Sequence, residues 1–325
     1  MIVRTLKLHS MARPALVRCH SMLSLGVGHS GNLGHGETFD CWNPKKIDAL
    51  EGNTVMGAAC GASHSLVLLK DSQGRGKLAS FGSNVFGAPG HFEEGLSYFG
   101  DDGDDDTLTP ALLKSTFDYD IAQVAAGDFS SLARTRDGKV LSWGAGILGL
   151  GDEAYDGNPI EIKTGSLVVE SVDAKGHISV FLAKDLNGSS DVDLDLYWFG
   201  YLGDSQKALN PVRLGALANT RISSVAVGPS SLAVIGSNKS ESILRIWSWN
   251  DPSQHECSPR MIDNLPCVDL VSTLAPTVEI DVASLGINAL NLVSNSKILA
   301  TRYGVVFVNG SFSPIITRYN STQLL

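Results

Sequence analysis

Two neighbouring stretches decide the fold, A-A-C-G-A-S-H-S-L-V-L-L at residues 58–69 and G-K-L-A-S-F-G at residues 76–82. Small residues lead to a glycine, and an apolar run follows. A turn then reverses the chain, and a second run ends in an aromatic residue and another glycine. Two short runs of strand-forming residues around a turn predict a β-hairpin. Glycine suits the strand end, because only glycine adopts a positive φ without strain.

This pattern recurs at residues 125–144, 174–200 and 227–250, with a faded copy at 285–310. The glycines that begin successive copies are 49 to 66 residues apart, whereas the two anchors within a copy are 17 to 24 residues apart. A constant unit with variable connections is typical of a repeated supersecondary structure. The structural positions of the repeat are the glycines and aromatic residues Gly26, Gly61, Gly82, Gly127, Gly144, Gly176, Gly200, Gly228, Phe81, Trp143, Phe199 and Trp249.

Units of about 50 residues made of short strands have the size of propeller blades. A lone blade leaves both faces of its sheet exposed, whereas a ring of blades buries them, so we expect the aromatic positions to lie between neighbouring blades. The sequence therefore predicts an all-β fold, a β-propeller of six or seven blades. Residues 255–281 leave the seventh blade open. We expect a basic segment at 1–21, the propeller at 22–310 and a tail at 311–325.

The repeat resembles that of the regulator-of-chromosome-condensation family, whose members are β-propellers. The resemblance rests on residues 58–69, on D-G-K-V-L-S-W-G at 137–144 and on L-S-L-G-V-G-H-S-G-N-L-G-H-G at 23–36, and it is weak after residue 250. It implies that 282–310 completes the ring beside 22–36. One plant branch of the family senses ultraviolet light through tryptophans in a G-W-R-H-T motif, which this sequence lacks.

The charge of the chain is acidic and unevenly placed. The net charge is -9, which disfavours direct binding to nucleic acid, because such binding relies on Lys and Arg to neutralise phosphates. Residues 1–36 nevertheless contain four basic and no acidic residues, a pattern typical of a mitochondrial import segment. An ordinary basic arm and a wrongly chosen start codon are the alternatives. No stretch approaches the roughly 20 apolar residues of a transmembrane helix, and peripheral membrane association stays open.

The most acidic stretch is the candidate partner-binding site, and it consists of Asp101, Asp102, Asp104, Asp105 and Asp106. Its spacing does not fit a calcium-binding loop, so we interpret it as a solvated loop or as a docking site for a basic partner surface. His64 occupies a repeat position and is expected to be structural. The sequence indicates no catalytic triad, no metal site and no cofactor.

We therefore expect a monomeric, non-enzymatic propeller scaffold for protein partners. Family members in mitochondria take part in ribosome and respiratory-complex assembly, so the resemblance implies an organellar assembly complex as a partner. A guanine-nucleotide exchange factor for a small GTPase is one alternative, because the founding family member has that activity. A cytosolic regulatory subunit is the other, and it implies a cytoplasmic or nuclear location. Fold alone does not decide among these functions.

Overall fold

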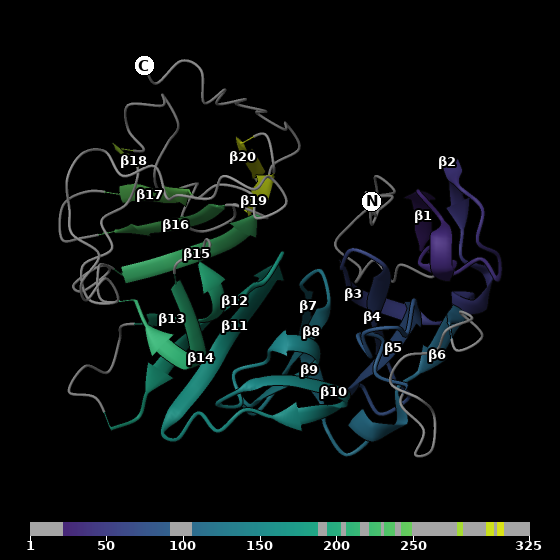
Figure 1. Cartoon of the computed structure of the whole chain (residues 1–325), viewed down its shortest axis with the longest axis horizontal. Helices are drawn as coiled ribbons and strands as arrows, with labels where there is room; N and C mark the ends of the chain where they lie inside the picture. Colours follow the sequence, from purple (N-terminus) through teal and green to yellow (C-terminus); the bar gives the residue numbers. More distant parts are fainter. Residues whose placement is uncertain are drawn as a thin grey trace. The chain divides into compact units, whose positions relative to one another are not determined.

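The computed structural model describes residues 22–91, 106–187, 194–202, 206–214, 221–228, 231–237, 242–248, 278–281, 297–301 and 304–308 (Figure 1). The chain divides into an N-terminal unit, residues 1–164, and a C-terminal unit, residues 165–325. Within the described ranges, no helix has both the length and the apolar character that a membrane span requires. The described residues include short 3-10 helices at His29–Gly31, Asp48–Leu50 and Lys114–Thr116.

Antiparallel strands make up nearly all of the regular structure. The N-terminal unit contains β1 (Leu23–Gly26), β2 (Cys41–Lys46), β3 (Thr54–Cys60), β4 (His64–Lys70), β5 (Gly76–Gly82), β6 (Thr107–Leu112), β7 (Ile121–Ala126), β8 (Ser130–Thr135), β9 (Val140–Ile147) and β10 (Glu153–Glu161). The C-terminal unit contains β11 (Leu167–Lys175), β12 (Ile178–Asp185), β13 (Asp195–Leu202), β14 (Gln206–Arg213), β15 (Arg221–Gly228), β16 (Ser231–Ser237), β17 (Ser242–Ser248), β18 (Val278–Asp281), β19 (Lys297–Thr301) and β20 (Gly304–Val308).

Four sheets share one topology, with four strands joined in chain order: β3 to β6, β7 to β10, β11 to β14 and β15 to β18. In each of them the register between the first and second strands shifts near the start of the first strand, at Val55/Gly57 in the first sheet and at the matching place in the others. Such a bulge adds one residue and increases the local twist. The predicted all-β fold, a β-propeller made of blade-like four-stranded sheets, is confirmed. The number of blades stays a prediction.

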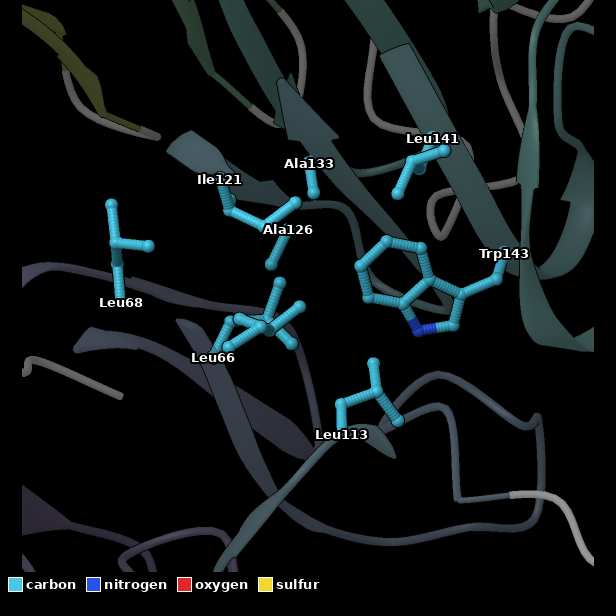
Figure 2. Close-up of a cluster of buried hydrophobic side chains, with 9 residues drawn as sticks. Leu66, Leu68, Leu113, Ile121, Ala126, Ala133, Leu141 and Trp143 are labelled. Carbon is cyan, nitrogen blue, oxygen red and sulfur yellow. The ribbon is translucent and has the colours of Figure 1, made fainter. Parts of the chain in front are cut away.

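Strand β4 shows why the apolar run at 64–69 is continuous instead of alternating. Successive side chains of a strand point to opposite faces of its sheet. Leu66 and Leu68 pack in a cluster that includes Ile121 and Trp143 of the next sheet (Figure 2). Val67 packs in a different cluster with Met22 and Ile47, beside β1 and β2. Both faces of β4 are therefore buried, and each fully buried side chain of this size stabilises the fold by about 1.5–3 kcal/mol.

The other sheets among the described residues have two strands each. In the N-terminal unit, β1 pairs with β2 and occupies the position of the third strand of a blade, since it ends at Gly26 as β5 ends at Gly82. In the C-terminal unit, β19 packs against β15 as β15 packs against β11, so β19 and β20 occupy the first and second positions. Completion of the ring by 282–310 beside 22–36 stays a prediction.

The structure corrects the interpretation of the last copy. The sequence pattern places the first glycine of this copy at Gly286 and assigns residues 304–310 to its aromatic strand, the third strand of a blade. Instead, β20 pairs with β19, with Thr301 opposite Gly304. The same sequence separation occurs between β11 and β12, where Lys175 pairs with Ile178. Phe307 therefore belongs to a second strand, and the faded sequence pattern shifted the assignment.

Candidate protein-interaction surface

The glycines that end the third strands occupy one strained and crowded place. Gly82, Gly144 and Gly200 have φ values of 116°, 108° and 105°. A Cβ atom at these positions would lie 2.4, 2.3 and 2.2 Å from a carbonyl oxygen in the turn between the first two strands of the same sheet. Gly26, at the end of β1, has a φ of 125°. A side chain here would meet both backbone strain and a steric clash.

The glycines of the other series begin the turn between the first and second strands. The N–H of Gly61 donates to the carbonyl of His64 at 3.0 Å, and the N–H of Gly127 donates to that of Ser130 at 2.9 Å. A Cβ atom on Gly61 would lie 2.2 Å from the imidazole of His64 and 2.5 Å from the carbonyl oxygen of Gly127. Gly176 lies in the matching turn of the third sheet. Gly228 is the last residue of β15, the first strand of the fourth sheet.

The aromatic positions are buried, with Phe81, Trp143 and Phe199 no more than 1 % exposed. The indole Nε1 of Trp143 donates to the carbonyl oxygen of Ala88 at 2.8 Å, and the Ser131 hydroxyl donates to the same oxygen at 2.6 Å. These bonds join the second sheet to the connection between β5 and β6, the third and fourth strands of the first sheet. They satisfy polar atoms that would be costly to bury without partners.

Trp249 lies outside the described residues. The register of the fourth sheet pairs Ser231 with Ser248 and Leu232 with Trp247. In the second sheet the corresponding pairs are Ser130 with Gly144 and Ser131 with Trp143. The register therefore aligns Trp247 with Trp143.

The acidic run is only partly described, because Asp101, Asp102, Asp104 and Asp105 lie outside the described residues. Asp106 accepts a hydrogen bond from the backbone N–H of Asn84 at 3.0 Å. Asp40 accepts one from the N–H of Gly28 at the same distance. Each aspartate immediately precedes the fourth strand of its sheet and holds the second residue after the strand-ending glycine. Asp106 thus stabilises the connection between β5 and β6 in the way that Asp40 stabilises the connection between β1 and β2.

A repeated serine–histidine pair was missed by the sequence interpretation. Ser24 Oγ donates to the carbonyl of Leu33 and lies 2.8 Å from His35 Nε2. Ser80 Oγ donates to the carbonyl of Pro89 and lies 2.8 Å from His91 Nε2. Each histidine follows the strand-ending glycine by nine residues, a regularity present in the sequence.

Burial lowers the pKa of both imidazoles, and nearby Lys45 lowers the pKa of His35 further. Neither serine has a free, exposed hydroxyl, since Ser24 is 1 % exposed and Ser80 is fully buried. The pairs therefore brace the glycine-rich connections and are not placed for nucleophilic catalysis, which needs an accessible nucleophile. Across the described residues, no cluster of three or more His, Cys, Asp and Glu side chains is arranged to hold a metal ion.

We define the loop face of the N-terminal unit as residues 27–42, 61–63, 83–91, 127–129 and 145–153, which form the connections and adjoining strand ends at one end of the sheets. The rings of Phe86 and Phe129 lie across two neighbouring connections, with centroids 4.3 Å apart. The hydroxyl of Tyr155, at the start of β10, donates to the carbonyl oxygen of Val85 at 3.2 Å. Phe86, Phe129 and Tyr155 are each half-buried, so part of this aromatic group lies at the surface beside the exposed Val85.

A second apolar group lies where β1 ends and β2 begins. Phe39 is 74 % exposed and Trp42 is 68 % exposed, and Val27 beside them is 40 % exposed. Large aromatic side chains dominate the energetics of protein interfaces, and a group of them left in water marks an interaction surface. The Phe86–Phe129 contact and the Phe39–Trp42 group each occur in one copy, so the repeat pattern gave no signal for them.

Comparisons with known proteins agree with this architecture. The family model described as the regulator of chromosome condensation (RCC1) repeat matches residues 20–68, and a second model with the same description matches residues 121–147. The Ultraviolet-B receptor UVR8 of Arabidopsis thaliana is 32 % identical over 227 residues, which cover 66 % of this chain and 46 % of the receptor. The E3 ubiquitin-protein ligase HERC2 of Homo sapiens is 30 % identical over 276 residues, or 82 % of this chain and 5 % of the ligase.

The crystal structure of human WBSCR16 has a TM-score of 0.54 and 20 % sequence identity, and the match covers 71 % of this chain and 58 % of that one. Identity at this level shows a shared fold. The chain spans less than half the length of the receptor and about a twentieth of the ligase.

Proposed function

Because the chain belongs to the proteins built from regulator of chromosome condensation (RCC1) repeats, we propose that it is a non-enzymatic propeller scaffold that binds other proteins through its loop face. The exposure of Phe39 and Trp42 carries this proposal. Interfaces draw most of their binding energy from a few aromatic and arginine side chains, which become buried at the centre of the contact. The matched region is only 5 % of the HERC2 ligase, so its ligase activity is no guide to this chain.

The test compares proteins captured by the tagged wild-type chain with those captured by a Phe39→Ser/Trp42→Ser variant. We expect the variant to lose its specific partners, because the exposed aromatic contact area is removed. Leu186→Ser is the matched control, since Leu186 is 64 % exposed but follows β12 in the turn at the other end of its sheet. Equal capture by all three proteins would reject the loop face as the binding surface.

We further propose that the scaffold acts in mitochondrial biogenesis. The basic, acid-free character of residues 1–36 supports this location. Mass spectrometry of the mature N-terminus from purified mitochondria tests it, and a trimmed N-terminus with ribosomal or respiratory-assembly partners is the expected result. An intact N-terminus in a cytosolic fraction, with a small GTPase captured, would favour nucleotide exchange. A measured exchange rate would then separate that activity from a regulatory-subunit role.

A further inference from the structure

Charge is distributed unequally between the two ends of the N-terminal sheets. The segments of the loop face contain no Lys and no Arg. All ten Lys and Arg residues in the described part of the N-terminal unit lie on strands, or on connections at the opposite end, such as Arg75 and Lys139. Several of these cations are in ion pairs there, for example Arg136 with Asp120 at 2.9 Å.

The loop face itself carries five carboxylates, Glu37, Asp40, Asp128, Asp152 and Glu153. Among them, Asp40, Asp152 and Glu153 are exposed. Lys45 reaches this set from strand β2: its Nζ lies 2.5 Å from Glu37 and keeps the pKa of that carboxyl below its usual range. The described loop-face segments therefore contribute carboxylates and exposed aromatic side chains but no Lys or Arg of their own.

We propose that the loop face binds a segment of a partner protein that bears several Arg or Lys side chains, an inference that rests on the proposed function. Carboxylates attract such a segment over several ångströms, and aromatic faces accept the cationic heads at closer range through cation–π contacts. Phe39, Trp42, Phe86 and Phe129 supply the rings, while Asp152 and Glu153 supply the charge. Arg meets both requirements best, because its guanidinium stacks on rings and binds carboxylates.

Contact through side chains is favoured over strand addition. The outer strand β2, which carries Trp42, also contains Pro44. Proline has no N–H to donate, so it interrupts the ladder of hydrogen bonds that an added strand would need. Nucleic acid is disfavoured for a different reason, since its phosphates would meet carboxylates and no Lys or Arg within the loop-face segments.

The probe is a fluorescein-labelled peptide with three repeats of Arg-Gly-Leu-Gly, and the matched peptide carries Gln in place of Arg. Fluorescence anisotropy is measured with the full chain. We expect the Arg peptide to bind and the Gln peptide to bind at least about fivefold more weakly, with the difference shrinking as salt screens the charges. Phe39→Ser/Trp42→Ser and Asp152→Asn/Glu153→Gln should each weaken binding of the Arg peptide, and Leu186→Ser should leave it unchanged.

Thermal unfolding of each variant shows whether it remains folded, and only variants with a wild-type midpoint are compared. Equal binding of the Arg and Gln peptides, no binding of either, or binding that is insensitive to both loop-face variants would overturn the inference. Loss of captured partners in Phe39→Ser/Trp42→Ser, with no preference for the Arg peptide, would leave the proposed function standing and reject only the basic partner. Unchanged capture would reject the proposed function itself.

Discussion

The imidazole Nε2 of His64 lies 2.9 Å from Oγ of Ser131, so a hydrogen bond links the second strand of one sheet to the second strand of the next. Both side chains are fully buried. The Ser131 hydroxyl also donates to the carbonyl of Ala88, and Ser65 makes the matching bond to the carbonyl of Asn32. The repeat therefore includes a polar link between successive sheets in addition to apolar packing.

Ser131→Ala should lower the free energy of unfolding by about 1–3 kcal/mol, because it leaves buried polar atoms of His64 and Ala88 without this partner. Urea denaturation measures the change. Ser130→Ala is the control. Within the described residues, the Ser130 hydroxyl makes no hydrogen bond, unlike that of Ser131. Equal effects of the two substitutions would contradict a specific link between the sheets.

Gly144→Ala should cost about 2–4 kcal/mol, because the residue has a positive φ and its new Cβ would lie 2.3 Å from the carbonyl oxygen of Phe129. Gly57→Ala is the matched control. Gly57 has no positive φ, and nothing lies within 4 Å of a Cβ placed there. The midpoint of urea unfolding should fall for the first variant and hardly change for the second. A normal midpoint for Gly144→Ala would refute the repeat assignment.

Trp143→Ala should destabilise the chain by about 3–5 kcal/mol, because it opens a cavity in the cluster shown in Figure 2 and removes the donor to Ala88. Trp42→Ala removes the same side chain from a site that is 68 % exposed, and we expect a change within about 0.5 kcal/mol. Differential scanning calorimetry compares the two. Similar losses of stability would mean that Trp42 is packed and not displayed.

The raised pKa of Asp173 predicts that the stability of the C-terminal unit depends on pH. The Asp173 carboxylate accepts hydrogen bonds from the backbone N–H groups of Val227 on β15 at 2.8 Å and of Ala174 at 2.9 Å. The residue is half-buried, yet the dense protein around the carboxyl desolvates it and raises its pKa to about 6, against an ordinary value of 3.8. Between these two values the folded state holds a proton that the unfolded state releases.

Stability from this group is therefore full below about pH 4 and declines as the pH rises through 6. The wild-type chain should gain stability over Asp173→Asn between pH 7 and about pH 4.5, by at most about 3 kcal/mol. Urea unfolding of both proteins across this range isolates the contribution, because other titrating groups cancel. A constant difference between them, or a gain at higher pH, would contradict the raised pKa.

Much of the fold could be predicted because the repeat places its signals within single hairpins. The strand-ending glycine and the aromatic residue before it mark the third strand, as Trp143 and Gly144 show. The fourth strands have no such signal, since their position depends on connections of variable length. The last pair of strands was assigned to the wrong positions for a related reason: β19 and β20 share only the apolar character of the expected pattern, while their register pairs Thr301 with Gly304.

The candidate surface was harder to predict. Phe86 and Phe129 are 43 residues apart in sequence and meet only because neighbouring sheets bring their connections together. Hydropathy alone cannot separate Trp42, which is exposed, from Trp143, which is buried. The acidic run suggested a docking loop, but the bond from Asn84 to Asp106 joins the two ends of one connection, 22 residues apart, and is invisible in the sequence.

Hydrogen–deuterium exchange of the chain with and without its captured partner tests the central claim most directly. The account predicts slower exchange at residues 27–40 and 83–91 of the loop face in the complex. The turns at 71–75 and 136–139, at the opposite end of the same sheets, should exchange as in the free chain. Slower exchange at those turns, with the loop face unchanged, would contradict the assignment of the binding surface.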